Sequence, residues 1–205
     1  MANLYLRSQG LATKASFGNY HYSTEFKWGD KKWEPRLNKR RDTGLLYHAR
    51  GADGAFWNVW KQSLEYQVQE DDIGDFIGLA GTGGKIPATW NGDEWIYDPN
   101  ALPVKDQPLV TPTTRGKGRV ARKEGDFESP HGEWNTLEIY TYGQEAVHVV
   151  NGVVVLSLKD TRHRVNGVFV PLTEGQIQIQ SEAAESYYRR MKIRPITSIP
   201  EHIRA

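Results

Sequence analysis

The sequence predicts an all-β fold, a two-sheet sandwich of the jelly-roll kind. The first observation behind this prediction is alternation, because residues 20–28 place Tyr20, Tyr22, Thr24, Phe26 and Trp28 on one side of an extended chain. The second is the number of short segments of this kind separated by turn residues, which is typical of sandwiches. The third is that long stretches with the 3.6-residue period of a helix are hard to find.

Further strands are expected in both halves of the chain. Asn151-Gly152 stands between apolar runs and predicts a hairpin, since this pair tolerates the positive φ of a type I′ turn. Residues 176–180 alternate Gln with Ile. The expected strands are 20–28, 44–50, 63–69, 134–142, 146–150, 153–158, 175–180 and 186–193. A chain of 205 residues that is 38% apolar can form one core, so we expect a single jelly-roll domain over residues 1–205, with long loop excursions at 28–42 and 82–123.

The composition excludes several partners and kinds of site. Lys and Arg total 26 against 25 Asp and Glu, so a net charge of +1 directs the chain neither to nucleic acid nor to a membrane surface. No stretch approaches the roughly 20 apolar residues of a membrane span. The absence of Cys excludes disulfides, thiolate metal sites and a Cys nucleophile. No signal peptide is recognisable. We expect a bacterial periplasmic or secreted protein whose export signal is missing from this chain, and leave a cytoplasmic location and the oligomeric state open.

The most unusual segment is the polar strand at residues 63–70. An extended chain there puts Glu65, Gln67 and Gln69 on one face, opposite three apolar side chains. If the expected strand 44–50 pairs with it, His48 and Arg50 would share that face. A carboxylate, an imidazole, an amide and a guanidinium form a plausible acid/base and sugar-binding set. The alternative is a simple exposed face without chemistry.

Several neighbouring side chains extend this set of candidates. Lys61, Trp57 and Trp60 are candidates for sugar binding, although Trp is more often packed in a core. His148 is an outside candidate whose alternative role is structural. The spacing of Glu65, Gln67 and Glu70 is similar to the E-x-D-x-x-E pattern of laminarinase-type glycosidases. Gln67 replaces the Asp, and Glu70 would need a bulge to reach the face, so a two-carboxylate displacement is disfavoured.

Charged clusters carry weaker expectations. The acidic residues 70–75 contain Glu70 and Asp72, which could hold a hard cation, but an acidic turn without metal is favoured, and we expect no metal and no cofactor. The basic runs within 28–42 and at 115–119 are interpreted as solvated loops, with binding of a phosphate or an acidic sugar as the alternative. P-loop, dinucleotide, H-E-x-x-H and nucleophile-elbow motifs are absent.

Together these segments resemble the 3-keto-disaccharide hydrolase domain family. Residues 41–48 (RDTGLLYH) are similar to its strand [ND]-S-G-[IL]-x-[FY]-[RH], and residues 63–70 (SLEYQVQE) to its strand x-x-E-x-Q-[IV]-x-[DE]. Residues 132–138 (GEWNTLE) and 148–152 (HVVNG) resemble two later motifs, and 175–180 with 191–195 fit the family's ending. The likeness covers about residues 18–195. The family's usual opening, a Trp followed by a D-G-x-[IL] turn, is missing.

The resemblance implies a concanavalin-A-like lectin/glucanase fold and activity on a 3-keto glycoside or disaccharide. A ketone at C3 acidifies the C2 proton, so that the bond at C1 can break by elimination and water can then add. Under this hypothesis Glu65 is the base and His48 the acid or ketone polariser, while Gln67, Arg50 and Lys61 hold sugar hydroxyls. The alternatives, in falling order, are a non-catalytic carbohydrate-binding module, a classical glycosidase and a protein-interaction domain.

Overall fold

The computed structural model describes residues 9–56, 58–101 and 119–204. Its strands form two sheets. The larger sheet has the strand order β1 (Gln9–Ala12), β14 (Gln176–Ser181), β3 (Asp42–Arg50), β4 (Gln62–Gln69), β5 (Phe76–Leu79), β9 (Arg119–Ala121), β8 (Trp95–Tyr97) and β7 (Ala88–Trp90). The smaller sheet has the order β13 (Val168–Pro171), β12 (Val153–Val165), β11 (Glu145–Val150), β10 (Asn135–Tyr142), β2 (Tyr20–Lys32) and β15 (Ala184–Pro195), and β6 (Thr82–Lys85) also pairs with β12.

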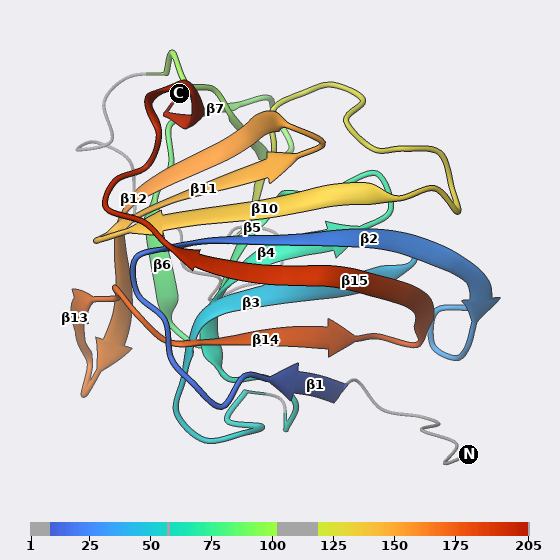
Figure 1. The fold of residues 1–205 in the computed structure, drawn as a ribbon, viewed down its shortest axis with the longest axis horizontal. Helices are drawn as coiled ribbons and strands as arrows, with labels where there is room; N and C mark the ends of the chain where they lie inside the picture. Colours follow the sequence, from blue (N-terminus) through green and yellow to red (C-terminus); the bar gives the residue numbers. More distant parts are fainter. Residues whose placement is uncertain (1–8, 57, 102–118, 205) are drawn as a thin grey trace.

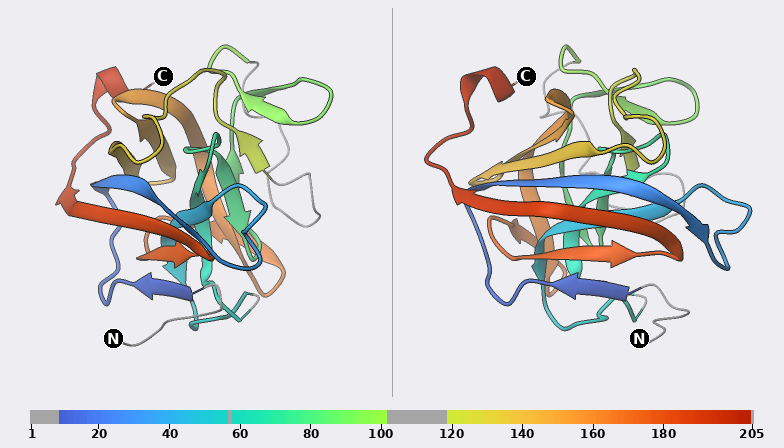
Figure 2. Two further views of the ribbon diagram at one scale, coloured as in Figure 1. Left: turned by 90° about the vertical axis from the view of Figure 1, so that its right-hand side faces the viewer. Right: turned by 45° about the vertical axis from the view of Figure 1, so that its right-hand side comes forward.

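The two sheets share one apolar core. Figures 1 and 2 show β10, β2 and β15 running side by side across one face of the molecule. The alternation of residues 20–28 produces this packing, because Tyr20, Tyr22, Phe26 and Trp28 turn inward and are buried. Leu45, Tyr47, Leu64, Tyr66 and Val68 of the larger sheet belong to the same cluster. The prediction of an all-β, two-sheet sandwich is therefore confirmed.

The predicted hairpin at Asn151-Gly152 is present between β11 and β12. Asn151 and Gly152 have φ angles of 49° and 80°, and Val150 pairs with Val153 across the turn. Positive φ at both central residues is the requirement of a type I′ turn, and Asn and Gly meet it with little strain.

The two expected loop excursions are shorter than the sequence indicated. The strand β2 continues to Lys32, so only residues 33–41 separate it from β3. The stretch 82–123 contains β6, β7, β8 and β9, and the last three extend the larger sheet. Strands of three or four residues are too short to show a clear alternation, and the stretch around them is rich in Gly, Pro and Thr, which is why sequence inspection misses them. Most of the basic run at 115–119 lies outside the described residues.

The C-terminal segment covers part of the smaller sheet. Ile199 and Ile203 are buried with Tyr140, Val147 and Val149, a cluster separate from the main core. The segment ends in a single 3₁₀ turn at Glu201–Ile203, and the described residues contain no helix that could cross a membrane.

Candidate functional site

The outward side of the larger sheet carries a row of polar side chains. The register pairs Glu65 with Leu46, Gln67 with Gly44 and Leu46 with Gln178, and paired residues lie on the same face. Leu45 and Tyr66 alternate with them and enter the inter-sheet core. We call this side the polar face and define it by Glu65, Gln67, Gln69, Gln178 and Gln180.

The polar face is buried. Glu65 and Gln67 are only 4% and 5% exposed, and the remaining three Gln residues are at most 9% exposed. These side chains therefore form neither a solvated cleft nor a simple exposed face. Burying polar groups costs free energy of folding unless the groups are hydrogen-bonded or bind a ligand.

Gly44 lies beneath the centre of the polar face. A Cβ atom at this position would lie 2.5 Å from Glu65 Oε1 and 2.6 Å from Gln180 Oε1. Gly44 has no positive φ, so its backbone does not require Gly. The absence of a side chain instead leaves the space that the Glu65 carboxylate and the Gln180 amide enter from two neighbouring strands.

The Gln180 amide oxygen meets no donor in this space. It is buried and accepts no hydrogen bond from the described residues. The other oxygen close to this Cβ position belongs to the Glu65 carboxylate, which is also an acceptor. Two acceptors that converge in this way are suited to an O–H donor placed between them, such as a sugar hydroxyl.

The Gln67 side chain is held by the backbone. Its Oε1 accepts a hydrogen bond of 3.0 Å from the Val68 N–H. Because the amide oxygen is used in this way, the Nε2 group is the part of the side chain that can donate to a ligand.

Hydrogen bonds fix both ends of the polar face. Gln69 Nε2 donates to Asp42 Oδ2 at 2.7 Å, and Arg36 donates to the same oxygen at 2.6 Å and also to Glu182. At the other end, Gln178 Oε1 accepts from the Lys61 backbone N–H at 3.2 Å. These side chains tie strands and loops together, which leaves Glu65, Gln67 and Gln180 as the central candidates.

His48 does not lie on the polar face, and the prediction that it shares a face with Glu65 is wrong. Its φ of 49° and the register shift after Tyr47 mark a bulge, which ends the simple alternation of β3. The imidazole is 1% exposed and makes an edge contact with Tyr20 of the opposite sheet, with ring centroids 5.9 Å apart. Burial lowers its pKa to about 4, so it is a neutral residue of the inter-sheet core.

Arg50 and Lys61 are also separated from Glu65. Arg50 pairs with Gln62, which lies three residues before Glu65 on β4 and therefore on the other face of that strand. The Arg50 guanidinium lies 3.5 Å from His163 Nε2. The Lys61 ammonium donates to the Gly51 carbonyl and to Asp53, both at 2.8 Å. Neither side chain is brought into contact with the centre of the polar face.

The aromatic candidates have different outcomes. Trp57 lies outside the described residues. Trp60 is 8% exposed and packs with Leu46 and Leu79 in a small apolar cluster on the outward side of the larger sheet. Trp60 therefore contacts Leu46, which is the cross-strand neighbour of Glu65. It is a packed side chain and does not offer an open ring face on which a sugar could stack.

His148 has a structural position. Its Nδ1 lies 2.8 Å from the Gly74 carbonyl and its Nε2 lies 3.0 Å from the Tyr47 hydroxyl, so both ring nitrogens are satisfied inside the core. The ring packs against Tyr66 at 4.6 Å between centroids. Burial lowers its pKa to about 4. It cannot contact a substrate on the polar face.

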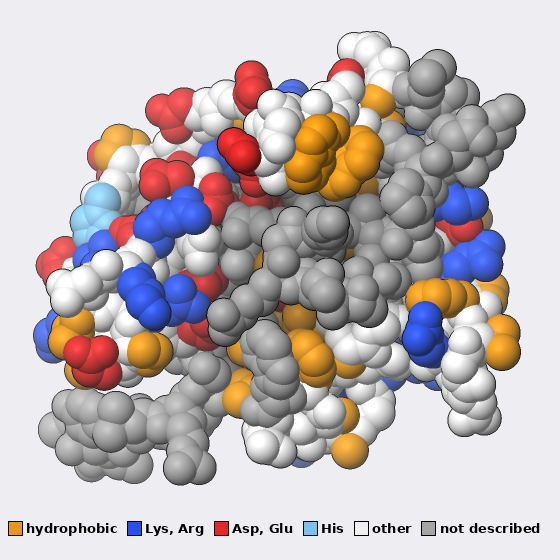
Figure 3. Space-filling view, turned by 180° about the vertical axis from the view of Figure 1, so that it is seen from behind, with side chains coloured by type: hydrophobic (Ala, Val, Ile, Leu, Met, Phe, Trp, Pro, Cys, Tyr) orange, Lys and Arg blue, Asp and Glu red, His pale blue; other side chains and the backbone are white. Residues whose placement is uncertain are grey.

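The expected acidic and basic clusters neutralise each other. Glu70 pairs with Arg41 at 2.5 Å and Asp72 with Arg40 at 2.6 Å. Figure 3 shows blue and red side chains interleaved at one end of the molecule. Among the described residues, no group of three or more His, Asp or Glu is arranged to hold a metal ion. This acidic turn is therefore tied to the loop between β2 and β3.

Sequence reasoning missed Gln178 and Gln180 as site residues. Their alternation with Ile177 and Ile179 was visible, but nothing in the sequence indicated that β14 lies next to β3. The available signal was the same one that singled out β4, since long amides on one face of a strand fit a sandwich core poorly.

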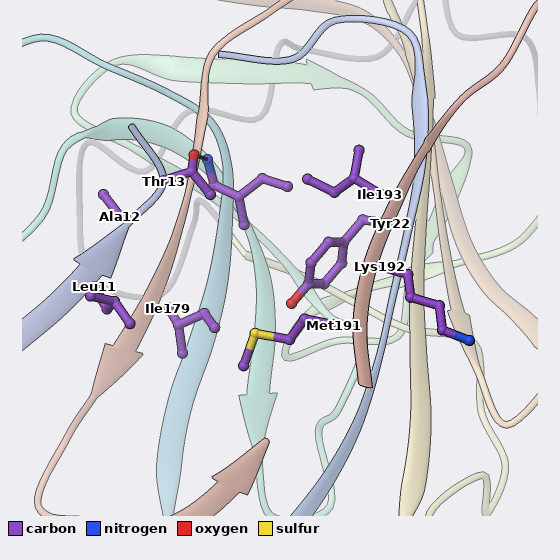
Figure 4. A pocket seen from close by; sticks show the side chains of 9 residues that line it. Leu11, Ala12, Thr13, Tyr22, Ile179, Met191, Lys192 and Ile193 are labelled. Atoms are coloured by element: carbon purple, nitrogen blue, oxygen red, sulfur yellow. Dashed lines mark hydrogen bonds between the residues drawn. The ribbon is translucent and has the colours of Figure 1, made fainter. Parts of the chain in front are cut away.

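The inward-facing side of β14 lines a different feature. Ile177 and Ile179, with Leu11, Tyr22 and Met191, border an apolar groove of about 420 Å³ at the open edge between β1 and β15 (Figure 4). The groove lies on the opposite side of β14 from Gln178 and Gln180, so it is not part of the polar face.

Comparison with solved structures shows the fold. Two proteins from Parabacteroides distasonis, each described as a "putative glycosyl hydrolase", align with TM-scores of 0.52 and 0.53 at 15% and 16% identity; the alignments cover 93% and 90% of this chain and 85% and 75% of theirs. The carbohydrate-binding module CBM66 from Bacillus subtilis aligns with a TM-score of 0.52 at 11% identity over 91% of this chain and 81% of its own.

Family assignment comes from sequence. No curated protein matches the chain. The model of the 3-keto-alpha-glucoside-1,2-lyase-like domain, the 3-keto-disaccharide hydrolase family, matches residues 6–194. This range contains every strand except the last residue of β15 and includes the whole polar face, and the chain therefore belongs to this family.

Proposed function

We propose that the protein cleaves a 3-keto glycoside or disaccharide on the polar face, with Glu65 as the base. The observation that carries the proposal is the convergence of the Glu65 carboxylate and the Gln180 amide over Gly44, in a chain of this family. The solved relatives of the same fold include a carbohydrate-binding module, which supports a sugar as the ligand.

The chemistry needs a proton acceptor beside C2 of the sugar. The C3 ketone acidifies the C2 proton, and Glu65 takes it. The electron pair of the C2–H bond forms a C1–C2 double bond as the C1–O bond breaks, and the leaving oxygen takes up a proton. Water then adds a hydroxyl to C1 and a hydrogen to C2, so the sum is hydrolysis. A second carboxylate as nucleophile is not required, which suits a face whose other members are amides.

The amides have complementary roles in this proposal. The Gln67 Nε2 group, oriented by the Val68 N–H on its oxygen, donates to the ketone or to an adjacent hydroxyl oxygen. The Gln180 oxygen accepts from a sugar hydroxyl that lies between it and Glu65. His48, given the acid or polarising role from sequence, has no part in this mechanism because it lies between the sheets.

The second candidate is a non-catalytic carbohydrate-binding module on the same face. It is favoured by the similarity in fold to a binding module and by the predominance of amides among the five side chains. The two candidates differ at Glu65, because a binding module needs an acceptor there whereas the lyase route needs a base.

The experiment measures release of the aglycone from a 3-keto glucoside by the wild type, by Glu65→Gln and by Glu174→Gln. Glu174 is an exposed carboxylate in the segment before β14 and serves as the control. Loss of a general base costs about 10² to 10⁴ in rate, so Glu65→Gln should lose turnover while Glu174→Gln keeps it. Undiminished release by Glu65→Gln would remove Glu65 from the mechanism. Binding of the keto glucoside by the wild type without turnover would establish the binding module instead.

A further inference from the structure

The outward side of the smaller sheet carries a second, differently charged polar surface. The register places Ser23 between Lys192 on β15 and Glu138 on β10. The next row along the strands holds Glu25 between Arg189 and Thr136. This surface lies on the opposite layer of the sandwich from the polar face, and the main core separates the two.

A hollow opens where the shortest side chains meet. It has a volume of about 280 Å³ and is lined by Ser23, Thr24, Glu25, Thr136, Arg190 and Lys192. The hollow exists because Ser23 and Thr136 are short, whereas their neighbours on β10 and β15 are long. Its size is close to the lower end of the range for small-molecule sites and suits a single sugar ring.

The charge around the hollow is positive. Its surroundings combine two carboxylates, Glu25 and Glu138, with five cationic side chains, namely Lys27, Arg189, Arg190, Lys192 and Arg194. This surface therefore holds a larger excess of positive charge than the whole chain, whose net charge is +1. Since the rest of the molecule compensates, the field is local.

Most of these charges have partners, and the Lys27 ammonium lies over the rings of Trp134 and Tyr187. Glu25 accepts hydrogen bonds from Arg189 and Arg190, both at 2.6 Å, and His21 bridges Glu138 at 2.7 Å and Arg194 at 3.2 Å. The Lys192 ammonium lies at the rim of the hollow and makes no hydrogen bond or ion pair with a described residue. It is the group that an anion would meet without displacing an existing pair.

A bulge in β15 beside the hollow sets the direction of the Arg190 and Lys192 side chains. The register of β15 against β2 shifts between Arg189 and Lys192, and Arg190 has a φ of 54°. A bulge of this kind inserts an extra residue and re-aims the flanking side chains. Here it brings both Arg190 and Lys192 to the border of the hollow.

We propose that this hollow binds a uronic acid residue of an acidic glycan. The sugar carboxylate pairs with the Lys192 ammonium, and ring hydroxyls bond to the hydroxyls of Ser23 and Thr136 and to the remaining lone pairs of Glu25. The presence of Glu25 decides between ligands, because a carboxylate in the wall repels a phosphate dianion but accepts hydrogen bonds from hydroxyl groups. A carboxylated sugar supplies both the anion and the hydroxyl donors.

The experiment titrates the protein with a galacturonic acid trisaccharide and with its methyl ester, which removes only the charge. Calorimetry should show binding of the acid, little binding of the ester, and weaker binding as salt rises. Lys192→Gln should weaken the acid complex about tenfold. Lys159→Gln, an exposed strand lysine on β12 with the same loss of charge, should leave it unchanged.

Further variants distinguish recognition of a sugar in the hollow from attraction by charge alone. Ser23→Leu fills the hollow without changing the charge and should abolish binding. Glu65→Gln should bind the trisaccharide as the wild type does, so that loss of this site can be distinguished from loss of the proposed lyase activity. The proposal is overturned if the trisaccharide acid does not bind, or if Lys159→Gln weakens its binding as much as Lys192→Gln does. It is also overturned if polyglutamate or polyphosphate binds equally tightly with the same dependence on Lys192, because the surface would then recognise charge rather than a sugar.

Discussion

Gly44→Ala tests the geometry of the polar face directly. The added methyl group would lie 2.5 Å from Glu65 Oε1 and 2.6 Å from Gln180 Oε1, whereas ordinary contact begins near 3.4 Å. Both oxygens must therefore move by about 1 Å. Because both are the ends of flexible side chains, the strand can stay in place while the carboxylate and the amide are displaced.

The expected effects on turnover and on stability differ in size. A misplacement of about 1 Å at a reacting group can cost about 10²-fold in rate, so turnover of a 3-keto glucoside by Gly44→Ala should fall by about that factor. Overpacking destabilises by about 1–3 kcal/mol, and the loss of chain entropy on replacing Gly offsets about 0.4–1 kcal/mol of it. The protein should therefore remain folded, as urea unfolding would show.

Gly29→Ala is the matched control for Gly44→Ala. Its added methyl group would overlap the carboxylate of Glu185, on the smaller sheet and away from the polar face. It carries a comparable steric cost and should keep turnover. If Gly44→Ala were as active as the wild type and Gly29→Ala, the position of Glu65 above Gly44 would be irrelevant to the reaction, and the catalytic role of the polar face would be refuted.

Two further predictions concern stability. Burial lowers the pKa of both His48 and His148 to about 4, so below the unfolded pKa of about 6.5 the unfolded chain binds protons that the native state does not. The free energy of unfolding should therefore be highest above pH 6.5 and fall by roughly 3 kcal/mol per histidine as the pH drops to 4. Urea titrations that show no such slope would contradict this prediction. Tyr66→Phe removes the 3.0 Å hydrogen bond to the Val149 carbonyl between the sheets and should cost about 1–2 kcal/mol in urea unfolding without affecting turnover. Tyr187→Phe removes a hydrogen bond to Glu185 at an exposed position and should cost less than about 0.5 kcal/mol.

Sequence reasoning succeeded where a local pattern determines the structure. The alternation of residues 20–28 requires one buried face, and Asn151-Gly152 requires a tight turn, so both could be inferred without knowing any long-range contact. Glu65 and Gln67 were found in the same way, since the period of a strand places them together on the face opposite Tyr66.

The same reasoning failed at His48 because alternation depends on an unbroken register. A bulge changes the number of residues on one strand relative to its partner, and the side chains that follow exchange faces. His48 has a positive φ, which is uncommon for any residue other than Gly although His adopts it more often than most, and no other feature of the segment Leu45–Arg50 signals it. His48 therefore lies in the inter-sheet core, although the two-residue period of a regular strand would place it beside Glu65.

The centre of the polar face depends on residues far apart in the chain. Glu65 and Gly44 come from the antiparallel pair β3–β4, whose proximity the sequence suggested, but Gln180 comes from β14, more than a hundred residues later. Gly44 joins them, because the space above one small residue is what allows a carboxylate and an amide from opposite neighbours to meet. In a sheet whose paired Cβ atoms stand about 5 Å apart, a longer residue at this position would keep the two groups separate. The glycine of the 41–48 segment is thus a requirement of the site rather than of the backbone, and its replacement is the most direct test of whether the polar face performs chemistry.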